Sequence, residues 1–211
     1  MKQQNIDWAA AVKPLIKKYK DTPHPLEAKN LYEMMVMVVL SARSNDKLIN
    51  SVAPDLFKEF PTMARLSQAT PAAIIPHITK VINHGNKAEW LSKIAKAVKT
   101  DKAIPLTMEE LVKLPGIGRK SANVIKRYAG VEAEGIMVDL HTVRVSNRLG
   151  IANSEDPVVI EKQMMEVLPK NEWDAGMAMS FLGRDICRPK PECPVCLMKK
   201  DCKFYQENFN N

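Results

Sequence analysis

The chain has 211 residues, of which 45% are hydrophobic, so it can bury a sizeable core and is not a disordered chain. Its formal net charge of +7 favours a polyanionic partner, although an ordinary basic protein also fits the charge alone. The longest apolar run, Met34–Leu40, has seven residues, against the roughly 20 that a membrane-spanning helix needs. With no apolar signal core at the N-terminus, we expect a cytoplasmic protein, associated with the nucleoid if it binds DNA, and no membrane contact.

Apolar residues recur with helical spacing along the chain, and no run of alternating residues predicts a strand. The first predicted helix carries five residues on one face: Trp8, Val12, Leu15, Ile16 and Tyr19. Leu31–Leu40 is apolar nearly all round, which predicts a central buried helix. Thr70-Pro71 and Asp156-Pro157 each place a capping residue before a first-turn proline, which predicts a helix start. The fold class is therefore predicted to be all-α.

The segment Leu114–Ile125, which reads LPGIGRKSANVI, is the first specific motif. A short helix is predicted to end at Leu114, a tight turn to contain Gly116 and Gly118, and a second helix to begin near Arg119. The free N–H groups of such a turn and helix start form a site for an anion. A plain helix corner is the alternative, but the spacing matches a helix-hairpin-helix, whose natural anion is a DNA phosphate.

Lys120 falls in the first turn of the second hairpin helix, where the helix dipole is positive. That dipole, together with burial, lowers a lysine's pKa and frees the amine to attack the anomeric carbon of a sugar. Asp139 follows an apolar approach in GIMVDLHTVRVSNRLG and could accept a proton or stabilise positive charge on the sugar. The structural alternatives are a solvated surface lysine and an aspartate that caps the next helix. His141 is expected to be a structural hydrogen-bonding residue.

All four cysteines lie within 16 residues near the end of the chain, at Cys187, Cys193, Cys196 and Cys202. In a reducing compartment they are not expected to form disulfides. Four close thiolates suit either zinc or an iron–sulfur cluster, and the spacing alone does not choose between them. Basic residues are interleaved with the cysteines, which predicts a second phosphate-binding element: Arg188, Lys190, Lys199, Lys200 and Lys203.

The hairpin, the VDLHTVRVSNRLG segment and the four-cysteine tail resemble the endonuclease III family of helix-hairpin-helix DNA glycosylases, from Leu31 to Cys202. The resemblance implies two helical domains that flank a DNA-binding cleft. Residues 23–133 would form a six-helix domain with the hairpin, and residues 1–22 and 134–211 the cluster domain. Lys120 would attack the sugar, Asp139 would be the essential aspartate, and the cysteines would bind a [4Fe–4S] cluster. The implied partner of this monomer is double-stranded DNA that contains a damaged base or an abasic site.

Two loops and one spacing depart from the family pattern. Arg43, in LSARSND, replaces a glutamine that enters the DNA stack. Asn83, in VINHGNKAEW, stands where a larger apolar residue is common, and His84 follows it. Five residues separate the first two cysteines, where the family usually has six. The expected DNA-binding residues are Arg43, Asn83, His84, Gly116, Gly118 and Arg119.

The leading prediction is a base-excision glycosylase with AP lyase activity that removes oxidised pyrimidines, after base flipping, and nicks the strand by β-elimination. A monofunctional uracil or thymine mismatch glycosylase is the first alternative, which Lys120 disfavours. A non-enzymatic iron–sulfur DNA-binding protein is the second, which the presence of both Lys120 and Asp139 disfavours. An adenine-mismatch enzyme would need a catalytic glutamate before the Arg43 loop, and Met34–Leu40 contains none.

Overall fold

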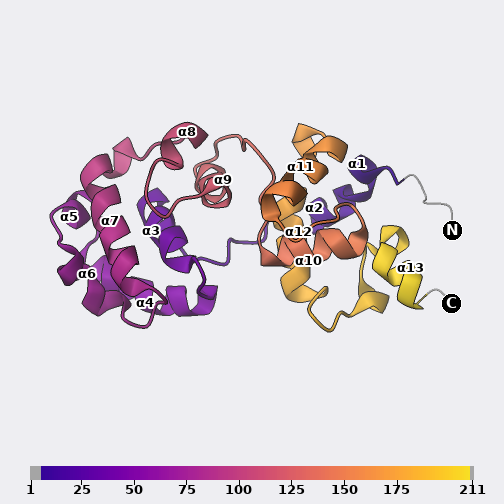
Figure 1. Ribbon diagram of the computed structural model, residues 1–211, viewed down its shortest axis with the longest axis horizontal. Coiled ribbons are helices and arrows are strands. Elements are labelled where there is room, and N and C mark those ends of the chain that lie inside the picture. Colours follow the sequence, from indigo (N-terminus) through magenta and orange to yellow (C-terminus); the bar gives the residue numbers. More distant parts are fainter. Residues whose placement is uncertain (1–5, 210–211) are drawn as a thin grey trace. The chain divides into compact units, whose positions relative to one another are not determined.

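The structure is a computed structural model that describes residues 6–209 (Figure 1). Throughout this range the regular elements are helices, and no strand occurs there, which confirms the all-α prediction. The chain divides into two compact units. One consists of Pro23–Glu132, and the other joins the described residues up to Thr22 with those from Ala133 onward. None of the described helices is both long enough and apolar enough to cross a membrane.

The unit of Pro23–Glu132 is built around one buried helix, α3 (Leu31–Ser41). Eight of its side chains are buried, and it packs against three other helices of the unit. This is the central buried helix that the apolar run predicts. The other elements are α4 (Asp46–Glu59), α5 (Met63–Ser67), α6 (Pro71–Ile78), α7 (His84–Val98), the 3-10 turn η1 (Asp101–Ala103), α8 (Met108–Leu111) and α9 (Arg119–Tyr128).

Polar caps decide where most of these helices begin. Asn30, Asn45 and Thr70 each accept a backbone N–H of the following first turn with their side chains. The predicted helix start at Thr70-Pro71 is therefore confirmed. The helix before the hairpin ends at Leu111, not at Leu114 as predicted, because the chain tightens there into turns with three-residue spacing and Pro115 disfavours helical backbone at the residue before it.

The second unit contains α1 (Trp8–Ala11), α2 (Lys13–Tyr19), α10 (Leu140–Leu149), α11 (Pro157–Val167), α12 (Ala175–Asp185) and α13 (Lys203–Phe209), with the 3-10 turns η2 (Lys170–Glu172), η3 (Cys193–Val195) and η4 (Lys199–Asp201). Its two sequence segments share one core, since the ring of Tyr19 stacks on that of Phe181 at 5.7 Å. The first predicted helix is divided into α1 and α2, because Pro14 lies in the first turn of α2 and has no N–H to continue the helix.

Helices α10 and α12 pack at close range in this unit. A Cβ atom at Gly176 would lie 2.4 Å from the Met137 carbonyl oxygen, and one at Gly183 would lie 2.8 Å from the His141 Cβ. Small residues on α12 therefore let the start of α10 approach it closely. This contact fixes the segment that leads into Asp139, the N-cap residue of α10.

Candidate functional site

The hairpin joins α8 to α9 through a turn in which one glycine is required. Gly116 has a φ of +78°, and a Cβ there would lie 2.5 Å from the ring of Trp90. Gly118 has no such requirement, because its φ of −97° and ψ of 178° are open to any residue. Gly118 is the N-cap of α9, and with no side chain it provides no cap. The N-cap residue of α9 therefore contributes no side chain to the helix start, and a helix start of this kind suits an anion.

Lys120 is the second residue of α9 and lies on its exposed side. The helix is anchored beneath it by Ala122, Val124 and Ile125, all of which are buried. Within the described part of this unit, no hydrogen bond or ion pair involves the Lys120 ammonium. The burial that the sequence analysis expected for this amine is not observed, because the hairpin helix packs with its opposite face.

Asp139 is held in a single orientation at the start of α10. Its Oδ1 accepts from the backbone N–H groups of His141 at 2.9 Å and Thr142 at 2.8 Å, and from the Thr142 hydroxyl at 3.1 Å. Its Oδ2 accepts from the Ser180 hydroxyl at 2.6 Å and lies 3.5 Å from a guanidinium nitrogen of Arg184. The carboxylate is only 13% exposed. The helix-capping alternative therefore describes its geometry, whatever its chemical role.

Ser180 and Arg184 are the neighbours of Asp139 that its sequence motif does not predict. They lie one turn apart on α12, a spacing that places them on one helix face. Nothing in the local sequence connects them to Asp139, which is 41 residues before Ser180. His141 behaves as predicted, since its Nδ1 lies 3.2 Å from a guanidinium nitrogen of Arg144. Lys120 and Asp139 belong to different units, and the structure describes each within its own.

The two loops that depart from the family pattern both contain left-handed backbone. Arg43 has a φ of 59° and follows the C-terminus of α3, and its side chain is exposed. Asn83 also has a φ of 59° and is the N-cap of α7, whose first residue, His84, is half-buried. Non-glycine residues with positive φ are uncommon and cluster at functional sites. The apolar side chain exposed in the second loop is Ile82, at 53%, which the sequence analysis did not single out.

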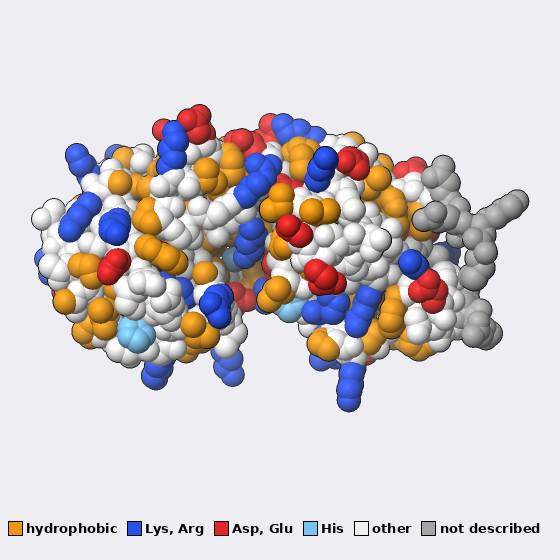
Figure 2. Space-filling model, in the orientation of Figure 1, with side chains coloured by type: hydrophobic (Ala, Val, Ile, Leu, Met, Phe, Trp, Pro, Cys, Tyr) orange, Lys and Arg blue, Asp and Glu red, His pale blue; other side chains and the backbone are white. Residues whose placement is uncertain are grey.

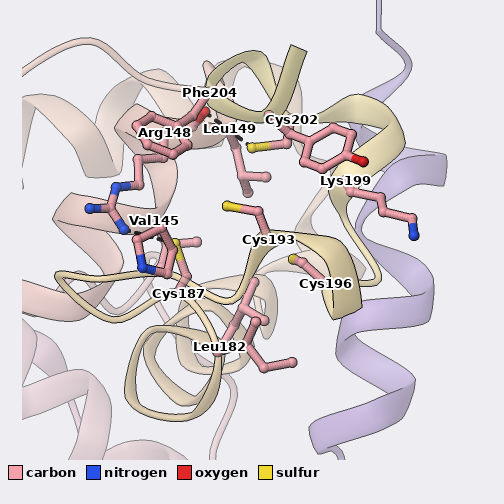
Figure 3. A pocket seen from close by; sticks show the side chains of 13 residues that line it. Val145, Arg148, Leu149, Leu182, Cys187, Cys193, Cys196, Lys199, Cys202 and Phe204 are labelled. Carbon is pink, nitrogen blue, oxygen red and sulfur yellow. Dashed lines mark hydrogen bonds between the residues drawn. The ribbon is translucent and has the colours of Figure 1, made fainter. Parts of the chain in front are cut away.

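The four cysteines line one cavity in the second unit (Figure 3). Its walls also include apolar residues of α10, of α12 and of the α12 C-cap: Val145, Leu149, Leu182 and Ile186. Burial raises the pKa of the Cys202 thiol to about 11, and it also raises the pKa values of Cys193 and Cys196. Across residues 6–209, no three His, Cys, Asp or Glu side chains group closely enough to hold a single metal ion. Four thiols that share one cavity are nevertheless compatible with the donor set of an iron–sulfur cluster.

Arg148 of α10 braces the loop between Cys187 and Cys193. Its guanidinium donates to the carbonyls of Arg188 at 2.7 Å and Pro189 at 3.0 Å. It also lies 3.5 Å from the Cys187 sulfur and 5.0 Å from the centre of the Phe204 ring (Figure 3). A half-buried residue of α10 therefore contacts the five-residue loop in which the sequence departs from the family spacing.

Comparison with known proteins assigns the chain to a family. Residues 36–170 match the model of the HhH-GPD superfamily of base excision DNA repair proteins. Endonuclease III of Thermotoga maritima is 33% identical over 180 residues, which cover 83% of this chain and 84% of that protein. Endonuclease III of Bacillus subtilis is 36% identical over 184 residues, which cover 84% of this chain and 83% of that protein.

Solved structures agree with this assignment. A trapped covalent intermediate of endonuclease III with DNA matches with a TM-score of 0.82 and 33% identity, and covers 94% of this chain and 95% of the other. A non-covalent endonuclease III–DNA complex matches with a TM-score of 0.83 and 32% identity, and covers 96% of each chain. The chain is therefore a member of the HhH-GPD superfamily of base excision DNA repair proteins, in its endonuclease III branch.

Proposed function

We propose that the protein is a bifunctional DNA glycosylase and AP lyase that removes oxidised pyrimidines from double-stranded DNA. The observation that carries the proposal is the position of Lys120, directly after the hairpin turn and in the first turn of a helix whose N-cap has no side chain. Lys120 is exposed, and no ion pair involves it among the residues that the structure describes. The related endonuclease III has been trapped as a covalent intermediate with DNA. A nucleophilic amine at this position supports a lyase over a monofunctional glycosylase.

The hairpin would bind the DNA backbone next to the lesion. The uncapped amides of α9 and the nearby Arg119 are suited to a phosphate, whose contacts position the protein without reading the sequence. The damaged nucleotide must leave the stack, because the duplex shields its anomeric carbon. The left-handed loops that carry Arg43, Asn83 and His84 would then contact the gap and the orphaned base.

Lys120 would carry the covalent step. The Lys120 ammonium first gives a proton to water. Its Nζ lone pair then forms a bond to C1′ as the glycosidic bond breaks, and the base leaves with the electron pair and takes up the proton that Nζ releases. Opening of the sugar ring gives a Schiff base between C1′ and Lys120. Loss of a proton from C2′ then expels the 3′ phosphate by β-elimination, which nicks the strand. Water hydrolyses the Schiff base and releases Lys120.

In this step, the negative charge of Asp139 would stabilise positive charge on the sugar. Hydrogen bonds occupy both of its oxygens, and Oδ2 is shared by the Ser180 hydroxyl at 2.6 Å and the Arg184 guanidinium at 3.5 Å, which leaves little room for a transferred proton. We therefore favour electrostatic stabilisation of the positive charge that develops on the sugar over proton acceptance. A carboxylate already fixed by its neighbours requires no reorganisation during the reaction.

We also propose that the four cysteines hold a [4Fe–4S] cluster. Thiolates on different sides of one cavity, within apolar walls, suit a polynuclear cluster better than one zinc ion, which draws its ligand sulfurs to about 2.3 Å from a single point. The cluster would tie the C-terminal loops to α10 and α12. The exposed Lys190 and Lys200 of these loops would then form a second contact with phosphates. We place the enzyme, as a monomer, on the DNA of the cytoplasm or nucleoid.

The test separates base release from strand cleavage. Duplexes with an oxidised pyrimidine, a uracil or thymine mismatch, or an abasic site are scored for both products, with borohydride added to trap a Schiff base. We expect release and cleavage at the oxidised pyrimidine, and a trapped adduct that Lys120→Gln abolishes. Lys113→Gln is the matched control, because Lys113 is an exposed lysine before the turn that pairs with Glu109.

Two outcomes would overturn the proposal. Release of uracil or thymine without strand cleavage and without an adduct would establish the monofunctional alternative. A normal adduct yield from Lys120→Gln would assign the nucleophile to another amine.

A further inference from the structure

Lys87 is a buried lysine that the proposed reaction leaves unexplained. It lies on α7, is 1% exposed, and is among the largest fully buried side chains in the described chain. A buried ammonium is costly unless it is paired. Among the described residues, no carboxylate forms an ion pair with Lys87. Its two partners are backbone carbonyls, those of Leu40 at 2.8 Å and Ala42 at 2.6 Å.

Both carbonyls belong to the C-terminus of α3. The last carbonyls of a helix have no partner within the helix and carry the negative end of its dipole, so a cation is favoured there. Burial lowers the pKa of Lys87, and the nearby Arg43 guanidinium acts in the same direction. Lys87 is therefore a C-terminal cap supplied by a different helix.

The residues from Ser41 to Ser44 form a tight turn, and Arg43 holds a position in it that rarely suits an arginine. Ser44 N–H donates to the Ser41 carbonyl at 2.9 Å, Ala42 has φ −54° and ψ 118°, and Arg43 has φ 59°. These are the features of a type II turn, in which the residue in the place of Arg43 is usually glycine or asparagine. A type II turn differs from a type I turn by a flip of its central peptide. Here the oxygen of that peptide is the Ala42 carbonyl, the one that Lys87 binds.

The same lysine lies in the first turn of α7, the helix that follows the second loop. Its backbone N–H donates to the Asn83 carbonyl at 3.1 Å, so it closes the first turn of α7 behind the left-handed Asn83. Its side chain meanwhile reaches the Arg43 turn. One residue therefore contacts both loops that depart from the family pattern.

We propose that Lys87 is a positioning residue for DNA recognition: by holding the Ala42 carbonyl it keeps the turn in its type II form and aims Arg43 at the base opposite the lesion. This inference rests on the proposed contact between Arg43 and DNA. A planar guanidinium with a fork of donors can pair bidentately with guanine, but only if its backbone is preset. Packing alone would be satisfied by a methionine, which has a similar apolar stem.

The first measurement needs no DNA. Arg43 is itself a trypsin site, so the rate of cleavage after Arg43 reports how firmly the turn is held. Lys87→Met removes the ammonium and keeps the stem, and it should speed this cleavage several-fold. Ala42→Gly frees the turn at an exposed residue without touching Lys87, and it should do the same if Lys87→Met folds poorly. Lys96→Met, at an exposed lysine of the same helix, is the control and should leave the rate unchanged.

The second measurement is excision of one oxidised pyrimidine placed opposite each of the four bases. Arg43→Gln should remove a preference for guanine of about 10-fold, the order expected for one bidentate base contact. Lys87→Met and Ala42→Gly should remove the same preference in the wild-type background. Neither should change the profile further when combined with Arg43→Gln.

The outcomes separate the two proposals. An unchanged trypsin rate in Lys87→Met overturns the role of Lys87 in the turn. If Lys87→Met is cleaved faster by trypsin but keeps its preference for guanine, the role of Lys87 in recognition is overturned. A further change of the opposite-base profile when Lys87→Met is combined with Arg43→Gln overturns it as well. If Arg43→Gln itself leaves the base preference unchanged, the proposed Arg43 contact fails, whatever the trypsin result.

Discussion

Asp139 is both a structural and a proposed chemical residue, and one substitution separates the two roles. Asp139→Asn replaces an accepting oxygen with an NH₂ group that faces donors, so one hydrogen bond is lost. We expect a stability loss of about 1 to 3 kcal/mol and a fall in turnover on the order of 100-fold or more. Thermal unfolding and single-turnover excision measure the two effects, with DNA affinity as the check on folding.

Ser180→Ala is the matched control for this prediction. It removes one donor to Asp139 Oδ2 and leaves the negative charge in place. We expect an intermediate loss of turnover, because the carboxylate is less well fixed. Turnover of Asp139→Asn close to the wild-type value would exclude Asp139 from the reaction.

The sequence predicts Asp139 as a candidate site residue more readily than it predicts the residues that surround Asp139. Asp139 precedes a helix start, and the structure places it as the N-cap that was weighed as the alternative. Ser180 and Arg184 complete its environment through tertiary packing of α12 on α10, which depends on the small Gly176 and Gly183. No local periodicity encodes a contact between residues 41 positions apart.

In the hairpin, substitutions of Gly116 and Gly118 should distinguish an effect on folding from an effect on DNA binding. Gly116→Ala would place a Cβ 2.5 Å from Trp90 at a φ of +78°, and left-handed backbone alone costs roughly 1–2 kcal/mol. We expect Gly116→Ala to lower Tm clearly and to weaken DNA binding. Gly118→Ala has extended backbone and open space around the new Cβ, so it should keep Tm.

Gly118→Ala should nevertheless weaken DNA binding if a phosphate lies against the start of α9, because the added methyl would stand beside those amides. Thermal unfolding and duplex affinity, measured on both variants, test this division. Equal losses of Tm in the two variants would contradict it. The sequence could not distinguish these glycines, since the requirement at Gly116 comes from Trp90 on α7.

The helices themselves were largely predictable, and their ends were less so. The apolar run of α3 and the Thr70 cap of α6 agree with the structure, because both signals are local. The break between α1 and α2 lies at a proline that the apolar face alone did not reveal. The early end of α8 at Leu111 similarly depends on the turn before Pro115.

The loop between Cys187 and Cys193 depends on one arginine of α10. Arg148 donates to two carbonyls of this loop and contacts the Cys187 sulfur. We expect the purified protein to contain about four iron atoms per chain, as a [4Fe–4S] cluster requires. Arg148→Met should lose iron faster to a chelator and lower Tm, because the loop is no longer braced.

Arg188→Met is the control for this prediction, since the Arg188 side chain is exposed and pairs with Glu192 within the loop. Iron content, sulfide content and Tm are measured for the three proteins. One zinc and no iron in the wild-type protein would refute the cluster. Equal rates of iron loss from both variants would refute the bracing role of Arg148.

At the scale of the whole molecule, each unit has its own core and contributes one part of the proposed chemistry. The hairpin with Lys120 lies in Pro23–Glu132, and Asp139 with the cysteines lies in the other unit. Composition gives no sign of a boundary between them, because the linkers are short and unremarkable in sequence. Only the family resemblance supplied the expectation that the N-terminal segment joins the C-terminal one.

The net charge of +7 leads to a prediction about salt. Figure 2 shows Lys and Arg side chains on the visible faces of both units. If the hairpin and the cysteine loop both bind phosphates, log Kd should rise steeply with log salt concentration, with a slope of about 0.9 per phosphate contact.

Lys190→Gln and Lys200→Gln, at exposed positions of the cysteine loops, should each lower that slope by about one. Lys96→Gln, exposed on α7, should leave it unchanged. Titration of a lesion-containing duplex at several salt concentrations gives the slopes, and wild-type slopes in both loop variants would remove the cysteine loops from the DNA interface.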